Sequence, residues 1–518
     1  MTPRRATVLA SRNLIPLALA CSCAVAALGC ASRRDQVQRH SSSVTVASTG
    51  NEEYGMNPDY DLDEKFLVFL PLLSEREDGE LEGRLARSWE QSPDRHEWTF
   101  HLRTDVRWED GVPVTARDVK FTLALLTNPQ LGIISPHQVE SVTVDNDSTV
   151  RVRLFNLAAL RGLIDDVIFP SHLLEGLNEK DVETWDFWLQ PVGDGPYRQL
   201  RRIPKTLVEF EINPGYYGTR PRIERVIVRS VGDTRFAELL SGAIDVLEGP
   251  SAAQSLLLAK DSRFGLYHGN HNGIYGIFWN DSLPLFRDPR VRRALTLAIN
   301  RPEAREVLAL PPDFPVVDGP YTSRQLQRGD LPAPLPYDTV QARSLLEAAG
   351  WFDRDGDGVR ERDGRPFHFV VFVPPGRRRV VSEALAVYAQ EQLRRVGVRM
   401  EIQSVQTAGA PSGHSEAIVL ASGGIGWWVR TFGDSSLIGY HNPRVTELLR
   451  QLPLTMDPDE EDRILREMTG ISQAEAPATF FFPSVQLVAA NRRIRGLSSP
   501  WRSNPLRYMD KLWLEDPR

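Results

Sequence analysis

The chain has 518 residues, of which 41% are hydrophobic and 25% charged, and its formal net charge is −7. This composition is typical of a globular protein, and the length allows two or three lobes. The acidic balance argues against a nucleic-acid-binding protein.

The first 29 residues have the layout of a signal peptide. Three arginines within the first twelve residues precede an apolar run from Leu14 to Gly29. This order is typical of a secretion signal, and the run is too short for a stable membrane span. We expect residues 1–29 to be removed on export, which changes the formal net charge from −7 to −10.

All the cysteines of the chain, Cys21, Cys23 and Cys30, lie in or at the end of this segment. The folded body therefore has no disulfide and no catalytic thiol. The tetrapeptide at 27–30, Ala-Leu-Gly-Cys, resembles the lipobox of bacterial lipoproteins, in which a small residue precedes a cysteine that takes diacylglycerol. We expect Cys30 to be lipidated and residues 30–43 to form a flexible tether, with ordinary cleavage as the alternative. The expected location is extracytoplasmic, lipid-anchored to a membrane.

Strand patterns begin soon after the tether. Trp98, Phe100 and Leu102 alternate with polar residues, as in a half-buried strand. Residues 142–144 and 150–154 flank an Asp-Asn-Asp turn, which predicts a hairpin.

Helix starts are predicted from capping residues that precede an apolar face with helical spacing. The predicted helices follow Thr115 (with Asp118), Asp288 (with Pro289) and Asp338 (with Gln341).

Residues 367–405 predict a strand, a crossover helix and a second strand. The apolar strand Phe367 to Val373 is followed by a helical pattern through Leu385 and Leu393, and then by alternation from Val398 to Ile402. A connection of this length favours parallel pairing, and hence an α/β sheet in the C-terminal half.

A set of ordered motifs between residues 80 and 480 resembles the signature of the extracellular solute-binding proteins of family 5. The longest runs through Leu85–Glu90, Trp98–Arg103 and Trp108–Val119. The others are Pro-Val-Gly-Asp-Gly-Pro-Tyr at 191–197, Ser-Gly-Ala-Ile-Asp-Val at 241–246, the segment 288–301 ending Ala-Ile-Asn-Arg, and Gly-Tyr-His-Asn-Pro at 439–443. Members of that family bind oligopeptides, dipeptides, nickel chelates or sugars for ABC importers.

The resemblance implies an α/β, bilobed periplasmic-binding-protein type II fold with an inserted accessory domain. Residues 44–55, 190–275 and 484–518 would form lobe I, residues 56–189 the accessory domain, and residues 276–483 lobe II. The chain would cross between the lobes near 275–280 and 480–483, and closure there would bury a ligand.

The resemblance also points to a ligand-binding segment. In peptide-binding relatives, a Gly-Trp-x-x-Asp segment supplies a carboxylate for the peptide ammonium, whereas this chain has Arg430 at the acidic position. We therefore expect a ligand other than an ordinary free-amine peptide, with an anionic group that the planar fork of Arg430 can hold. The ligand-contact residues predicted are Trp427, Trp428, Arg430, Asp434 and Tyr440, with packing in the core as the alternative for the tryptophans.

Two segments have only weak sequence support as metal sites. Residues 353–358 begin like a calcium loop, but Gly364 stands where a bidentate glutamate is needed, so a hairpin turn is favoured. His268 and His271 lack a third ligand in view. No nucleophile elbow, phosphate loop or zinc-protease motif occurs in the sequence.

The sequence thus predicts a substrate-binding protein of an ABC importer, and not an enzyme. The expected partners are a small-molecule or peptide ligand, ABC permease subunits and a membrane reached through the lipid anchor. No cofactor, no metal and no nucleic acid are expected, and the protein is expected to be a monomer. The alternative is a surface lipoprotein that acts as a sensor or protein-interaction module with a reduced pocket.

Overall fold

The structure is a computed structural model. It describes residues 42–48, 64–76, 81–94, 96–128, 139–154, 166–178, 181, 185–308, 310, 314–373, 379–404, 416–421, 428, 431–433, 436, 438–452, 457–498 and 505–515. The predicted signal peptide, Cys30 and almost all of the tether lie outside these residues. None of the described helices is both long enough and apolar enough to span a bilayer.

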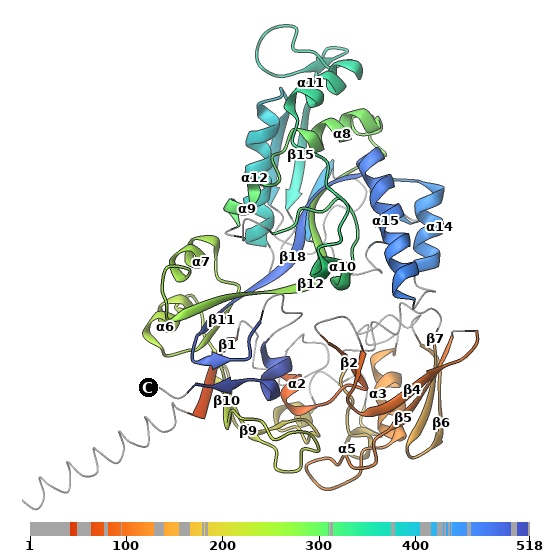
Figure 1. Cartoon of the computed structure of the whole chain (residues 1–518), viewed down its shortest axis with the longest axis vertical. Coiled ribbons are helices and arrows are strands. Elements are labelled where there is room, and N and C mark those ends of the chain that lie inside the picture. Colours follow the sequence, from red (N-terminus) through yellow and green to blue (C-terminus); the bar gives the residue numbers. More distant parts are fainter. Residues whose placement is uncertain are drawn as a thin grey trace, which may run out of the picture.

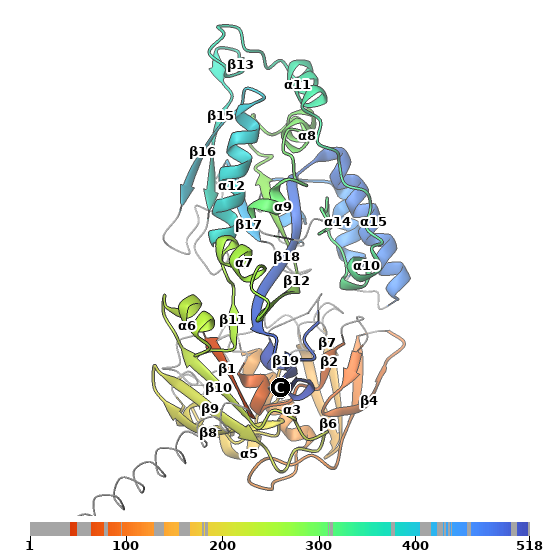
Figure 2. The same ribbon diagram turned by 60° about the vertical axis from the view of Figure 1, so that its left-hand side comes forward.

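A ten-stranded sheet runs through both lobes of the molecule, in the order β16-β15-β17-β12-β18-β11-β1-β10-β9-β8. Figure 1 and Figure 2 show β12 and β18 continuing from the lower body into the upper one. We refer to the lower-body part of this sheet with its two helices as lobe I, which comprises β1 (Ser43–Ser48), β8 (Tyr197–Ile203), β9 (Leu207–Ile212), β10 (Arg225–Ser230), β11 (Val246–Glu248), α6 (Arg235–Ser241) and α7 (Ala252–Leu258).

Lobe II, the upper body, packs helices around the other end of the sheet. Its strands are β15 (His368–Val373), β16 (Arg399–Ser404) and β17 (Ala417–Ala421). Its helices are α8 (Pro289–Leu297), α9 (Ala304–Val307), α10 (Ser323–Arg328), α11 (Thr339–Ala348), α12 (Arg379–Arg394), α14 (Pro443–Gln451) and α15 (Pro458–Glu475), and β13 (Glu361–Arg362) with β14 (Arg365–Pro366) forms a small hairpin.

The accessory elements, between residues 64 and 189, lie beside lobe I (Figure 1). Their main sheet has the order β4-β5-β7-β6 and is entirely antiparallel. The elements are α2 (Lys65–Val68), β2 (Leu73–Glu75), β3 (Leu81–Gly83), β4 (Ala86–Gln91), β5 (Glu97–Leu102), α3 (Ala116–Leu126), β6 (Val139–Asn146), β7 (Thr149–Leu154), α5 (Ser171–Leu174) and the 3-10 helix η2 (Asp186–Leu189).

The last described elements return the chain to lobe I and the accessory sheet. They are β19 (Ile494–Arg495), the 3-10 helix η4 (Pro505–Lys511) and β20 (Trp513–Leu514). The Nη2 atom of Arg84, beside β4, lies 3.5 Å from an Asp510 carboxylate oxygen, and Arg507 stacks on the Phe66 ring with its guanidinium carbon 3.9 Å from the ring centroid.

The predicted local structure is confirmed. Thr115 and Asp118 form a reciprocal capping box at the start of α3, Asp288 caps α8, and Asp338 caps α11. Strands β6 and β7 form the predicted hairpin. Strands β15 and β16 pair in parallel around helix α12, because the helical crossover returns the chain to the same end of the sheet.

Apolar packing joins the accessory elements to lobe I. One continuous cluster contains Val44 and Val226 of the lobe I sheet together with Phe100 and Leu123 of the accessory elements. The two described clusters of lobe II contain residues from 274 to 482 only. The accessory elements and lobe I therefore share a core, whereas lobe II has cores of its own.

Candidate functional site

Strands β12 (Phe264–Trp279) and β18 (Ala478–Asn491) carry the chain between the lobes. They pair antiparallel, with register shifts between Asn270 and Ile274 and between Ile274 and Gly276. Pro483 lies opposite Ile274, at this irregularity, where its missing N–H costs no regular ladder bond. The predicted crossing segment 275–280 overlaps this irregularity only at its start, and the segment 480–483 ends at Pro483.

A hydrogen bond and apolar packing both join lobe II to the irregular part of β12, where Ile274 belongs to a lobe II cluster. Tyr321, just before α10, is 9% exposed and donates a 2.7 Å hydrogen bond to the Gly273 carbonyl. The bond joins the long loop of lobe II to the point where the β12–β18 register changes.

The predicted ligand-contact residues separate into two groups. Trp427, Arg430 and Asp434 lie outside the described residues. Trp428 is 6% exposed and stacks on Phe432 and on Phe480 of β18, with ring centroids 5.0 and 5.6 Å away. Its described contacts are those of a core residue, which was the alternative considered for it, and they fasten the predicted ligand segment to a crossing strand.

Tyr440 is likewise buried. Its hydroxyl donates a 2.6 Å hydrogen bond to Glu475 at the end of α15, and Asn442 donates a 2.7 Å bond to the other oxygen of the same carboxylate. Burial, and then the bond to Glu475, raises the pKa of the Tyr440 phenol above its ordinary value. Tyr440 thus anchors the C-terminal end of the predicted ligand segment.

A buried ion pair lies beside this anchor. Arg292 of α8 is 3.0 Å from the carboxylate of Asp281 and also donates to the Glu475 carbonyl at 2.7 Å. Burial raises the pKa of Asp281 to about 7, with Arg292 opposing the shift and Glu475 adding to it. Sequence reasoning missed Asp281, Arg292 and Glu475, because no local pattern distinguishes them from the many other charged residues.

The Ala-Ile-Asn-Arg motif ends in a structural arginine. Arg301, 1% exposed, is paired with Asp318 and donates to the carbonyls of Phe480 at 2.9 Å and Leu335 at 2.6 Å. The motif therefore holds the loop around Asp318 against strand β18.

Two other sequence motifs meet where the accessory elements join lobe I. The Glu109 N–H donates to the Gly193 carbonyl at 2.8 Å, and the Gly193 N–H donates to the Glu109 carboxylate at 3.0 Å. Asp194 is 1% exposed and accepts a 2.9 Å bond from the Leu70 N–H. Burial, its dominant cause, raises the pKa of Asp194 well above the ordinary value. These motif residues hold the joint together.

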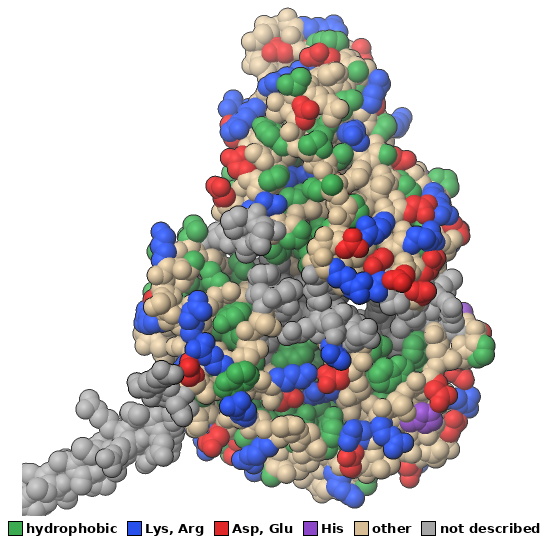
Figure 3. All heavy atoms as spheres, viewed as in Figure 1, with side chains coloured by type: hydrophobic (Ala, Val, Ile, Leu, Met, Phe, Trp, Pro, Cys, Tyr) green, Lys and Arg blue, Asp and Glu red, His purple; other side chains and the backbone are tan. Residues whose placement is uncertain are grey.

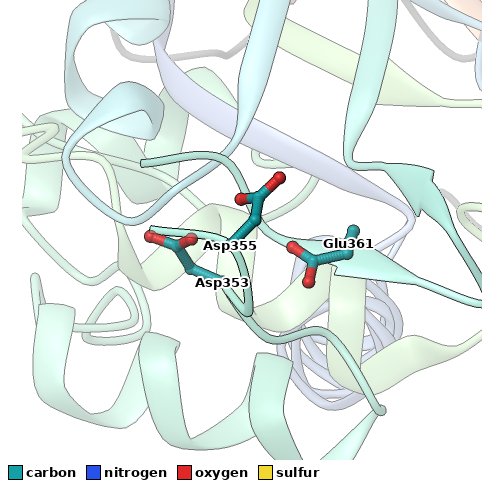
Figure 4. Close-up of side chains that lie close together, drawn as sticks. All are labelled: Asp353, Asp355 and Glu361. Atoms are coloured by element: carbon teal, nitrogen blue, oxygen red, sulfur yellow. The ribbon is translucent and has the colours of Figure 1, made fainter. Parts of the chain in front are cut away.

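The acidic turn at 353–361 is a hairpin connection closed by its own backbone. Asp353, Asp355 and Glu361 bring three carboxylates together on one loop (Figure 4). The Asp353 carboxylate accepts from the Gly356 and Gly358 N–H groups, and Glu361 accepts from the Arg354 N–H. Among the described residues this is the one group of three potential metal ligands, and its bonds are those of a tight turn.

The described residues form two separately packed bodies that share the strands β12 and β18. Two strands connect separate cores, aromatic and ionic contacts fix one long segment beside them, and the charged clusters are engaged in structural bonds. This arrangement suits the enclosure of a solute between two lobes.

Comparisons with known proteins agree with this arrangement. A family model described as bacterial extracellular solute-binding proteins, family 5 Middle, matches residues 80–439. The oligopeptide-binding protein AppA of Bacillus subtilis (strain 168) is 27% identical over 431 residues, which cover 79% of this chain and 74% of that protein. A putative ABC transporter peptide-binding protein of Brucella ovis is 29% identical over 336 residues, 63% of this chain and 60% of its own length.

Solved structures share the fold. The crystal structure of NikA from Brucella suis in complex with Fe(III)-EDTA aligns with a TM-score of 0.77 at 19% identity, over 91% of this chain and 100% of that one. The likeness extends over both lobes and the accessory elements.

Proposed function

This chain belongs to the bacterial extracellular solute-binding proteins of family 5, and we propose that it encloses a peptide-like or other small solute between two closing lobes. Its role is that of the extracytoplasmic substrate-binding component of an ABC importer. The observation that carries the proposal is the pair of crossing strands, β12 and β18, whose register changes between two separately packed bodies. Rotation about such a pair encloses a ligand without disturbing either core.

The chemistry of the ligand follows from the segment at 426–440. Arg430 occupies the position at which peptide-binding relatives place an acid, and a buried ammonium beside it would meet like charge. We propose that Arg430 binds an anionic group of the ligand, that Trp427 and Asp434 complete the contact, and that Trp428 and Tyr440 hold the segment in place. Replacing Arg430 with Ala should lower the affinity for the ligand found in the screen below, and an unchanged dissociation constant would refute this role.

The division of the chain is part of the proposal. Residues 44–55, 190–275 and 484–518 form lobe I, residues 56–189 the accessory domain and residues 276–483 lobe II. The protein binds its solute as a monomer and performs no reaction on it.

A thermal-shift screen against pools of peptides, sugars and metal chelates tests solute capture. A ligand present at 100 times its dissociation constant adds about 2.7 kcal/mol to the unfolding free energy, which is a readily measured rise in melting temperature. A flat response to every pool would favour the alternative, a sensor or protein-interaction module with a reduced pocket.

We further propose that residues 1–29 are a signal peptide and that Cys30 carries a lipid anchor. Labelling cells with a radioactive lipid precursor should mark the wild-type protein and leave the Cys30→Ala variant unmarked. Because the body contains no other cysteine, the result has one interpretation. Equal labelling of both proteins would refute the assignment of Cys30.

A further inference from the structure

Charge is distributed unevenly along the chain. Residues 56–189 carry 13 Lys and Arg against 26 Asp and Glu, whereas residues 44–55, 190–275 and 484–518 together carry 18 Lys and Arg against 14 Asp and Glu. The lobe I segments are thus basic within an acidic protein. Such an asymmetry orients a molecule in an external field.

Four arginines of lobe I lie on one face of its sheet. The register of β8, β9 and β10 places Arg198, Glu211 and Arg225 in one row, and Arg201 opposite Glu209. The opposite face carries buried apolar residues such as Phe210, Val226 and Val228. We call the first side the arginine face. It comprises Arg198, Arg201, Arg225 and Arg229 with the glutamates between them.

The ion pairs of this face put the cations outermost. Glu209 bridges Arg201 at 2.7 Å and Arg225 at 2.8 Å. Its side chain is only 9% exposed, whereas those of Arg201 and Arg225 are 58% and 41% exposed. The Glu209 carboxylate thus lies beneath two guanidinium groups, and Arg198 is likewise more exposed than its partner Glu211, 42% against 27%.

Further cations and two apolar side chains are exposed in neighbouring parts of lobe I, and one of the cations, Arg222, stacks on the Trp513 ring with its guanidinium carbon 4.9 Å from the ring centroid. Arg220 and Arg222 are exposed in the β9–β10 connection. On the edge strand β8, Leu200 is 42% and Ile203 40% exposed. Figure 3 shows basic side chains along the lower left of the molecule, where β9 and β10 lie in Figure 1. Cations mixed with exposed apolar groups favour the interface of a bilayer.

The N-terminal segment reaches the folded body at the same place. Strand β1 pairs with β10 in parallel, with Ser43 beside Arg225, and the Glu224 N–H donates a 3.0 Å bond to the Ser42 carbonyl. Residues 31–42 would span about 40 Å if fully extended. A lipid on Cys30 therefore keeps this face within reach of the membrane.

We propose that the arginine face of lobe I lies against an anionic lipid surface. Each guanidinium near anionic headgroups adds attraction, and the tether keeps the local lipid concentration high. The accessory sheet, on the opposite side of lobe I from β8–β10 in both Figure 1 and Figure 2, then faces away from the negative surface. The inference rests on the proposed anchor for the direction of the tether, and on the observed charges for the contact itself.

Cosedimentation with lipid vesicles tests the proposal without the anchor. The chain from Ala31, which retains every described residue, is mixed with vesicles of phosphatidylcholine containing about 30% phosphatidylglycerol, or with pure phosphatidylcholine, at low salt. We expect binding to the anionic vesicles alone, and its loss at about 0.5 M salt. Equal binding to both vesicle types, or none to either, overturns the proposal.

Matched variants locate the contact. Arg201→Gln, Arg220→Gln and Arg222→Gln combined should weaken vesicle binding by about tenfold or more. The control combines Arg394→Gln, Arg399→Gln and Arg463→Gln in lobe II, whose side chains are 71%, 63% and 51% exposed. It changes the net charge equally and should bind like the parent. Equal weakening of both variants shows a net-charge effect and refutes a specific face.

A fluorescent reporter serves if a charge variant folds poorly. The body has no cysteine, so Thr206→Cys in the β8–β9 turn and Val340→Cys on α11 can each carry one polarity-sensitive dye. Anionic vesicles should shift the emission of the dye at 206 and not at 340. The reverse pattern contradicts the proposal. Neither result depends on a solute or on lipidation, so a failure here leaves the transport function intact.

Discussion

The accessory elements and lobe II are both attached to lobe I, but by different kinds of contact. The accessory elements share one apolar cluster with lobe I, and the Glu109–Gly193 bonds and the buried Asp194 fasten the two. Lobe II has separate cores and is reached through β12 and β18. We therefore expect the accessory elements and lobe I to behave as one body in the proposed closure, with lobe II as the other.

The largest effect on stability is expected where the Gly193 backbone packs between the accessory elements and lobe I. A Cβ on residue 193 would lie 2.1 Å from the Val68 carbonyl oxygen, so Gly193→Ala should cost about 3 kcal/mol of unfolding free energy. Gly232 has open space at the corresponding position, and Gly232→Ala should change little. Denaturant unfolding followed by circular dichroism measures both.

The form of the transition matters as much as its midpoint. If the accessory elements and lobe I are one body, Gly193→Ala lowers the stability of both together. A separate, earlier unfolding transition of the accessory elements in this variant would show that they and lobe I do not unfold as one body.

An intermediate effect is expected inside lobe II. The folded pKa of Asp281, about 7, lies above the ordinary value of 3.8, so the folded state holds this proton more tightly than the unfolded state. The associated stability is present below about pH 4 and is lost as the pH rises towards 7. Between pH 5 and pH 8, deprotonation of Asp281 should lower the free energy of unfolding of the wild type by about 2 kcal/mol. The Asp281→Asn variant should not show this decrease.

Asp288, in the same lobe, provides a control because its pKa is shifted in the opposite direction. Its bond to Arg290 holds its pKa below the ordinary value, so its contribution does not change between pH 5 and pH 8. Asp288→Asn should therefore retain the wild-type slope. A slope unchanged in Asp281→Asn would show that the buried pair does not titrate in this range.

The smallest effect on stability is expected at the hinge. Tyr321→Phe removes the bond to the Gly273 carbonyl and should cost about 1 kcal/mol. Tyr388→Phe removes a hydroxyl that bonds within lobe II to the Asn300 carbonyl at 2.9 Å and to the Glu303 carboxylate at 3.0 Å. If Tyr321 restrains the hinge, only the first variant should change the radius of gyration measured by small-angle X-ray scattering. An equal radius of gyration for both variants would show that the Tyr321 bond does not restrain the hinge.

Local patterns predicted much of this fold. Capping residues such as Thr115 and Asp338 act on N–H groups two or three positions away, so short-range reasoning identifies them. The β15–α12–β16 unit is also contiguous in sequence. The bilobed fold was inferred from the family resemblance, and the order of the ten strands was not predicted, because it depends on pairings between distant segments.

The candidate site was harder to predict, for the same reason. Tyr440 meets Glu475, and Arg292 meets Asp281 and the Glu475 carbonyl, only after α8 and α15 have packed together. Trp428 illustrates a second difficulty, because a tryptophan beside a ligand segment and one stacked on Phe480 have the same local sequence.

The position of β18 also constrains the time course of folding. In lobe I, β18 lies between β11 and β12, and it is among the last elements to be synthesised. Strand β1, the first described, must wait for β10 because Ser43 pairs with Arg225. Pairings so distant in sequence form slowly. A chain that emerges N-terminus first therefore cannot complete its central sheet until residue 491 is available.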